Sequence, residues 1–162
     1  MSEAPSQSIL LGDVKEGAVL PELAKEVKPV TVVLGAMASR DWRPQHHDYQ
    51  FATEHNGLEN IIMNTPNLAA WFERYLTDWS GPKGRLGRIE FRMKDSVYPG
   101  EIMRFLGTVM EVGPAQNGVG WVEVAIELRA GDKLCVGCTA RIAIPANEAA
   151  NPWALKGEDW KP

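Results

Sequence analysis

The chain has 162 residues, of which 44% are hydrophobic and 23% are charged, and its formal net charge is −4. This length and composition fit one globular domain. The acidic balance argues against general nucleic-acid binding, which normally uses a basic face. The sequence has no apolar run of the roughly 18 residues needed to span a membrane, and no basic and apolar leader opens it. We therefore expect a cytoplasmic protein that binds neither nucleic acid nor a membrane.

The first third of the chain contains few clear elements. Polar residues dominate the start, and we expect residues 1–17 to be flexible. Residues 20–28 are compatible with a first strand. The apolar run at residues 30–38 fits a strand or a helix equally well, because periodicity does not decide for so short a run.

The segment from residue 41 to residue 52 carries the clearest chemical signal. Asp41 and His46 are five positions apart, and Pro44 lies between them. Pro44 fixes its own φ angle and biases Arg43 toward an extended backbone, so the loop can bring Asp41 and His46 onto one water molecule. A carboxylate and an imidazole held together can share proton transfers near neutral pH. From spacing alone, a loop Asp and His that only form hydrogen bonds are the simpler interpretation.

All three histidines of the chain lie close to this segment, at His46, His47 and His55. A metal site built from them and Asp48 would lack the His-x-x-x-His spacing that places two ligands on one helical face. We therefore predict no metal. Neighbours in sequence usually point apart, so His47 is not expected to act with His46. Asp48 is expected to orient His47 or to cap a short helix that follows.

A long helix is predicted to start near residues 64–66. Thr65 is a suitable cap, and Pro66 suits the first helical position. Apolar residues then recur at helical spacing, namely Leu68, Phe72, Tyr75, Leu76 and Trp79. The Gly81-Pro82 pair ends the pattern.

Four strands are predicted after this helix, at residues 88–94, 101–112, 119–128 and 133–144. The first alternates strictly, so that Ile89, Phe91 and Met93 are expected to point inward. Turn residues separate the strands. A helix followed by antiparallel strands is an α+β pattern.

The last strand and the tail contain two further features. Cys135 and Cys138 form a lone Cys-x-x-Cys pair with no further ligands at matching spacing, so we expect two reduced cysteines and no zinc site. Residues 146–162 form a C-terminal tail. Trp153 and Trp160 in this tail need partners, which we expect on the domain or on another subunit.

The segment after residue 41 also resembles a family motif. Asp41, Pro44, His46 and Ala52 match the hydratase-2 motif of the MaoC-like hot-dog enzymes, in which Asn normally stands at the position of Arg43. The matches continue in residues 37–42, 46–48 and 72–82, which are similar to the small MaoC-like subunits of steroid side-chain enoyl-CoA hydratases.

The resemblance covers roughly residues 18–145 and implies a fold. It implies a single hot-dog domain over 18–145, in which a curved antiparallel sheet wraps one long central helix. It also implies that the apolar run at 30–38 is a short helix leading into Asp41.

The resemblance implies hydration of a 2-enoyl-CoA thioester, with a bulky or steroid-derived acyl chain. Asp41 and His46 would be the catalytic pair and would divide the proton transfers between them. A backbone N–H at Asn64 or Thr65, where relatives often have Gly, would polarise the thioester carbonyl. Coenzyme A would be part of the substrate, and no cofactor is expected.

Three basic residues are candidates for contacts with coenzyme A, namely Arg43, Lys83 and Arg85, because Arg and Lys bind phosphates. For Lys83 and Arg85, a charged strand end that faces solvent is the simpler interpretation. For Arg43, the simpler interpretation is a surface residue paired with an acid, and the more specific one is that it reshapes the loop beside the site.

The resemblance implies a partner, which is a second MaoC-like chain or another copy of this one. A single hot-dog domain leaves a sheet edge and an apolar face open, so pairing is expected. Two alternative functions remain. One is a non-catalytic subunit that completes a partner hydratase, and the other is a hot-dog acyl-CoA thioesterase.

Overall fold

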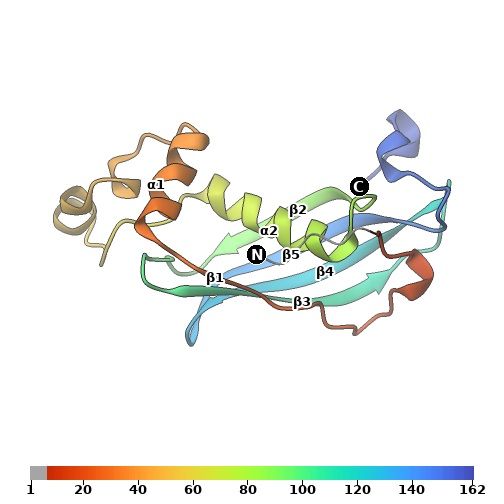
Figure 1. Cartoon of the computed structure of the whole chain (residues 1–162), viewed down its shortest axis with the longest axis horizontal. Coiled ribbons are helices and arrows are strands. Elements are labelled where there is room, and N and C mark those ends of the chain that lie inside the picture. The colour runs from red at the N-terminus through yellow and green to blue at the C-terminus, as the bar shows by residue number, and fades with distance from the viewer. Residues whose placement is uncertain (1–6) are drawn as a thin grey trace.

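The computed structural model describes residues 7–162, which form one antiparallel sheet and two α-helices. The strands are β1 (Leu23–Glu26), β2 (Arg85–Met93), β3 (Ile102–Val112), β4 (Val119–Ala130) and β5 (Lys133–Pro145), and the helices are α1 (Pro29–Ala38) and α2 (Thr65–Ser80). The strand order is β1-β3-β4-β5-β2, and α2 lies across one face of the sheet (Figure 1). This is the predicted α+β architecture, with the predicted short helix before Asp41.

The core lies between α2 and the sheet. The side chains of α2 that face the sheet are buried and recur at the predicted spacing, namely Leu68, Phe72, Tyr75 and Leu76. The Phe72 ring meets Phe105 of β3 edge-on, with centroids 5.0 Å apart, and stacks on Phe91 of β2 at 5.8 Å. Burial of these rings fixes α2 on the sheet, since a fully buried Phe contributes about 2–3 kcal/mol through its apolar surface alone. Among the described residues, every helix is too short or too polar to cross a membrane.

α1 and α2 approach each other closely at Gly35. The side chain of Asn67 occupies the space that a Cβ atom at position 35 would need. The Asn67 Nδ2 donates a hydrogen bond of 3.1 Å to the carbonyl oxygen of Thr31. The missing side chain at Gly35 therefore lets the first turn of α2 bind the backbone of α1.

Three details differ from the predictions. Asn64, not Thr65, is the N-cap of α2, and its side chain makes no cap hydrogen bond. Met93 is 46% exposed, because it lies at the end of the edge strand β2, where a side chain on the helix side has little to cover it. The strand β2 also begins at Arg85, three residues earlier than predicted.

The first described residues of the chain contact the region around the end of α2. The Ile9 N–H donates to the carbonyl oxygen of Ser80 at 3.2 Å, and the Lys83 N–H donates to Ser8 Oγ at 2.7 Å. Of the segment expected to be flexible, residues 1–6 lie outside the described residues. The domain boundaries at residues 17 and 145 stay predictions.

The C-terminal tail packs on the domain through a cluster of aromatic rings and one arginine. Trp160 contacts Trp121 of β4, with ring centroids 4.7 Å apart. The Arg85 guanidinium carbon lies 3.6 Å from the centroid of the Trp160 ring, and its Nη1 donates to the carbonyl oxygens of Pro152 and Leu155. The same guanidinium carbon lies 5.5 Å from the centroid of the Trp153 ring, so both tail tryptophans contact the domain through Arg85.

The two cysteines are free and buried within the sheet. Burial raises the pKa of the Cys138 thiol to about 12, and it also raises the pKa of Cys135. Both side chains are therefore protonated thiols at neutral pH, in keeping with two reduced cysteines.

Candidate active site

The end of α1 places Asp41. The Asp41 N–H donates to the carbonyl oxygen of Ala36 at 2.9 Å, and the Arg40 N–H donates to Met37 at 3.1 Å. This pair of bonds is a Schellman motif, in which the residue after the helix cap is left-handed and is usually Gly. Here that residue is Arg40, with a φ of 56°. The motif turns the chain sharply and directs Asp41 toward the start of α2.

A short helical turn at Pro44–His46 then brings His46 back to Asp41. The His46 N–H donates to the carbonyl oxygen of Arg43 at 3.1 Å, and the side chain is buried. The His46 Nε2 lies 3.4 Å from Asp41 Oδ2. The predicted approach of Asp41 and His46 is therefore present in the structure.

The other ring nitrogen of His46 is fixed by the backbone. Nδ1 lies 2.8 Å from the carbonyl oxygen of Ile62. A carbonyl oxygen only accepts hydrogen bonds, so Nδ1 must carry a proton. In the neutral imidazole, Nε2 then has a free lone pair and can accept a proton beside Asp41.

The Asp41 carboxylate accepts hydrogen bonds on both oxygens. Asn64 Nδ2 donates to Oδ2 at 3.2 Å, and the Arg43 N–H donates to Oδ1 at 3.5 Å. Burial by itself raises the pKa of Asp41. The hydrogen bonds from Asn64 and Arg43, and the charges of His46 and Arg43, outweigh burial and place the pKa of Asp41 below its usual value. Asp41 is therefore ionised at neutral pH.

The N-terminus of α2 lies beside this pair, because Asn64 contacts Asp41 directly. Among the described residues, the backbone N–H groups of Asn64 and Thr65 have no protein acceptor. Free N–H groups at the positive end of a helix are suited to an oxyanion. The expected oxyanion role of Asn64 and Thr65 stays a prediction, with both donors available.

Of the three basic residues considered for coenzyme A, only Arg43 lies at this site. Its Nε is 3.9 Å from Asp41 Oδ1, and its side chain is 77% exposed. Lys83 and Arg85 follow the other end of α2, about 24 Å away along a helix of 16 residues. There, Arg85 binds the tail, and Lys83 Nζ donates to the carbonyl oxygen of Glu148. Their contact with phosphate stays a prediction.

The remaining residues of the histidine segment have local roles. Asp48 Oδ1 accepts a hydrogen bond of 3.0 Å from the Phe51 N–H, so Asp48 caps the helical turn at Phe51–His55, as expected. The ring of His55 stacks on Phe51, with centroids 5.2 Å apart. Within residues 7–162, no three potential metal ligands lie together.

Sequence reasoning missed the Ser39 hydroxyl, the Ile62 carbonyl and the contact of the Asn64 side chain with Asp41. Asn64 Nδ2 donates to Ser39 Oγ at 2.7 Å, and Ser39 Oγ donates to the carbonyl oxygen of Gly35 at 2.7 Å. His46 contacts the backbone carbonyl of Ile62, and every residue type has such a carbonyl, so the sequence does not identify this partner.

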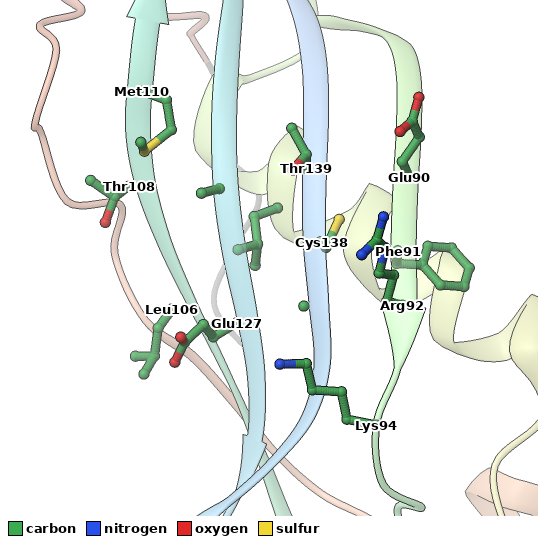
Figure 2. Close-up of a pocket in the computed structure, with 13 residues that line it drawn as sticks. Glu90, Phe91, Arg92, Lys94, Leu106, Thr108, Met110, Glu127, Cys138 and Thr139 are labelled. Carbon is green, nitrogen blue, oxygen red and sulfur yellow. The ribbon is translucent and has the colours of Figure 1, made fainter.

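A large depression lies elsewhere, on the face of the sheet opposite α2, and has a volume of about 890 Å³. Figure 2 looks onto this face, with Leu106, Thr108 and Met110 on β3 and Glu90 and Arg92 on β2. It contains no histidine and none of the residues around Asp41. The carboxylate and imidazole pair therefore remains the candidate active site.

Comparisons with known proteins agree with this geometry. The chain is 34% identical to the "3-oxo-4,17-pregnadiene-20-carboxyl-CoA hydratase beta subunit" of Mycobacterium tuberculosis, over 72% of this chain and 87% of that protein. The chain belongs to the MaoC-like hydratase family. No family model matches the sequence.

Solved structures of other proteins share the fold. The ChsH1-ChsH2 complex from Mycobacterium tuberculosis matches with a TM-score of 0.72 and 28% identity, over 80% of this chain and 98% of that chain. The R-hydratase PhaJ1 from Pseudomonas aeruginosa matches with a TM-score of 0.76 and 20% identity, over 86% of this chain and 88% of that chain. These matches confirm the predicted hot-dog fold and the resemblance to MaoC-like hydratases.

Proposed function

We propose that this chain hydrates a 2-enoyl-CoA thioester with a bulky, steroid-derived acyl chain, as one subunit of a MaoC-like complex. The observation that carries the proposal is the pair of Asp41 and His46, in which two proton-accepting atoms lie 3.4 Å apart. The M. tuberculosis relative, whose name describes a steroid-derived carboxyl-CoA hydratase, supports the substrate class.

In this scheme His46 transfers the protons, and Asp41 stabilises the charge that His46 gains. Nε2 of neutral His46 accepts a proton as the water oxygen forms a bond to Cβ of the enoyl group. The electrons of the C=C bond move onto the thioester oxygen and give an enolate. The resulting imidazolium, stabilised by the ionised Asp41, then donates this proton to Cα. The net reaction adds one water to one double bond.

The start of α2 stabilises the enolate in this scheme. The thioester oxygen gains negative charge between the addition of oxygen and the protonation of Cα. A backbone N–H of Asn64 or Thr65 donates to it, in a site where the donor is already oriented before the reaction.

The partner is a second MaoC-like chain. The ChsH1-ChsH2 structure is a complex of two different subunits, and the M. tuberculosis relative is named a beta subunit. The long edge strand β2 pairs with β5 on one side only, so a second chain has a free row of backbone groups to bind.

The test is a hydratase assay on the chain purified alone and with a MaoC-like partner. Loss of enoyl-thioester absorbance is followed for short, long and polycyclic acyl-CoAs. Asp41→Asn and His46→Gln should each lower turnover by at least about two orders of magnitude, the usual scale for a positioned acid or base. His47→Ala is the matched control, because His47 is exposed and its ring makes no hydrogen bond within the described residues.

Each alternative function gives a different result in this assay. If the chain is a non-catalytic subunit, Asp41→Asn leaves the activity of the complex intact. If it is a thioesterase, free coenzyme A thiol appears in step with the loss of substrate. Either result would contradict the proposal.

A further inference from the structure

The Asn64 side chain has an unusual arrangement for a helix cap. An Asn at this position normally accepts a hydrogen bond from an N–H of the first helical turn through its Oδ1. Here the side chain makes no such bond. Its Nδ2 instead donates one proton to Ser39 Oγ at 2.7 Å and one to Asp41 Oδ2 at 3.2 Å. The Asn64 side chain therefore contacts the Asp41 carboxylate and does not cap the helix.

The oxygen of this side-chain amide has no hydrogen-bond partner within the described residues. Asn64 is only 1% exposed, and its Oδ1 accepts no hydrogen bond within the described residues. An unsatisfied buried acceptor destabilises a fold, so it persists where another contact of the same group offsets it. For Asn64, the offsetting contacts are the hydrogen bonds that its Nδ2 donates to Ser39 and Asp41.

The direction of the amide follows from its neighbours. With the oxygen and nitrogen exchanged, Oδ1 would face the Asp41 carboxylate, and two acceptors would be in contact. The observed direction therefore matches an ionised Asp41. Ser39 fixes it further, because the Ser39 hydroxyl donates to the Gly35 carbonyl and so presents a lone pair to Asn64.

The geometry points to Asn64 and Ser39 as positioning residues that hold the ionised Asp41 carboxylate against Nε2 of His46. This inference rests on the proposed hydratase function. It assigns to the Asn64 side chain a role separate from the backbone N–H considered above. Hydrogen bonds that run from the Gly35 carbonyl through Ser39 and Asn64 to Asp41 tie the end of α1 to the start of α2.

Few charged groups act on Asp41. In the part of the chain that the structure describes, the charged groups that affect it are His46 and Arg43. The neighbours from the two helices, Ser39 after α1 and Asn64 before α2, are uncharged. Removal of the Asn64 amide therefore changes one hydrogen bond to Asp41 and no charge.

The test measures the ionisation of Asp41 directly. The side-chain carboxyl carbon of Asp41 is titrated by NMR and identified by its loss in Asp41→Asn. Asn64→Ala should raise the pKa of Asp41 and lower kcat about ten- to a hundredfold at pH 7, with little change in KM, because a displaced catalytic group costs this much. Asn64→Asp keeps the size of the side chain and replaces the donor by a carboxylate, so it should raise the pKa of Asp41 further.

Asn67→Ala is the matched control. It removes another amide from the first turn of α2, and with it a contact to α1, but Asn67 does not touch Asp41. It should leave the titration of Asp41 unchanged. Ser39→Ala should raise the pKa of Asp41 less than Asn64→Ala does.

A measurement on the unaltered protein covers the case in which a variant does not fold. The side-chain amide protons of Asn64 should shift with the same midpoint as the Asp41 carboxyl. Amide signals that do not move through this titration, or a folded Asn64→Ala with the wild-type pKa, would overturn the inference. A changed titration in a chain without hydratase activity would overturn the proposed function but support the hold on Asp41.

Discussion

The two ends of α2 use polar side chains in opposite ways. At the C-terminal end, Arg85 donates to two carbonyl oxygens of the tail and stacks on Trp160, so its hydrogen bonds are made within the chain. At the N-terminal end, Asp41 and His46 face each other at 3.4 Å, and Nε2 of neutral His46 keeps a free lone pair. Free hydrogen-bonding capacity, and not charge alone, distinguishes the candidate site from a structural cluster.

Thr65→Pro gives the largest expected effect on this comparison. Proline removes the N–H at the first position of α2, where it is otherwise well tolerated. If that N–H holds the enolate, its loss should cost about 3–4 kcal/mol in the transition state, roughly a hundred- to a thousandfold in kcat. Steady-state kinetics measure the loss, and circular dichroism checks the fold. Thr65→Ala, which keeps the N–H, should stay near wild type; equal losses in both variants would refute the backbone donor.

Arg85→Ala tests the other end of the helix. It removes two hydrogen bonds and a contact with an aromatic ring, so we expect a loss of about 2–3 kcal/mol in the free energy of unfolding. Denaturant unfolding measures this loss. The KM for acyl-CoA should be unchanged, because Arg85 binds the tail in this structure.

Arg88→Ala is the matched control for this change. Arg88 lies on the same strand and is paired with Glu90 at 3.5 Å on the surface. Its removal should change stability by about 0.5 kcal/mol or less. A rise in KM for Arg85→Ala with little loss of stability would support the phosphate-binding hypothesis.

Arg40→Gly should have a smaller and opposite effect. Arg40 has a φ of 56°, which costs a residue with a side chain about 1–2 kcal/mol relative to glycine. We expect the variant to be more stable by about 1 kcal/mol, as measured by thermal unfolding. A loss of stability would show that the Arg40 side chain contributes more than its backbone costs.

The smallest expected effect is on the stability of the fold at acidic pH. The pKa of Asp41 is lower in the folded chain than in the unfolded one, so its charge stabilises the fold above the usual Asp range. This contribution is lost as the pH falls through the lowered pKa. The melting temperature of the wild type should therefore fall relative to that of Asp41→Asn between neutral pH and about pH 3. Parallel melting curves over this range would contradict the pKa direction.

Much of the fold could be predicted from local patterns. Alternating apolar residues predicted β2 and β4, and helical spacing predicted α2, because both patterns follow from burial on one face. Turn residues marked the ends of the strands that became β3 and β5. The exposure of Met93 could not be predicted, since it depends on β2 being the edge of the sheet. The capping error arose because the Asn64 side chain makes a contact 23 positions away instead of a local one.

The candidate site could be predicted only in part. Asp41 and His46 were found because Pro44 makes their spacing favourable and because the segment resembles a motif. The Ile62 carbonyl could not be found, since any residue supplies a carbonyl and this one is 16 positions from His46. The tail contacts of Arg85 depend on residues 67 and 70 positions away, which no local pattern reveals.

The close approach of α1 and α2 at Gly35 has a consequence for the divergence of this family. A side chain at position 35 would overlap the amide of Asn67 and force the helices apart, and α1 carries Ser39 toward the base. Positions 35 and 67 should therefore change together during evolution. A relative with a larger residue at 35 should carry a smaller one at 67, even though neither position touches the reacting atoms.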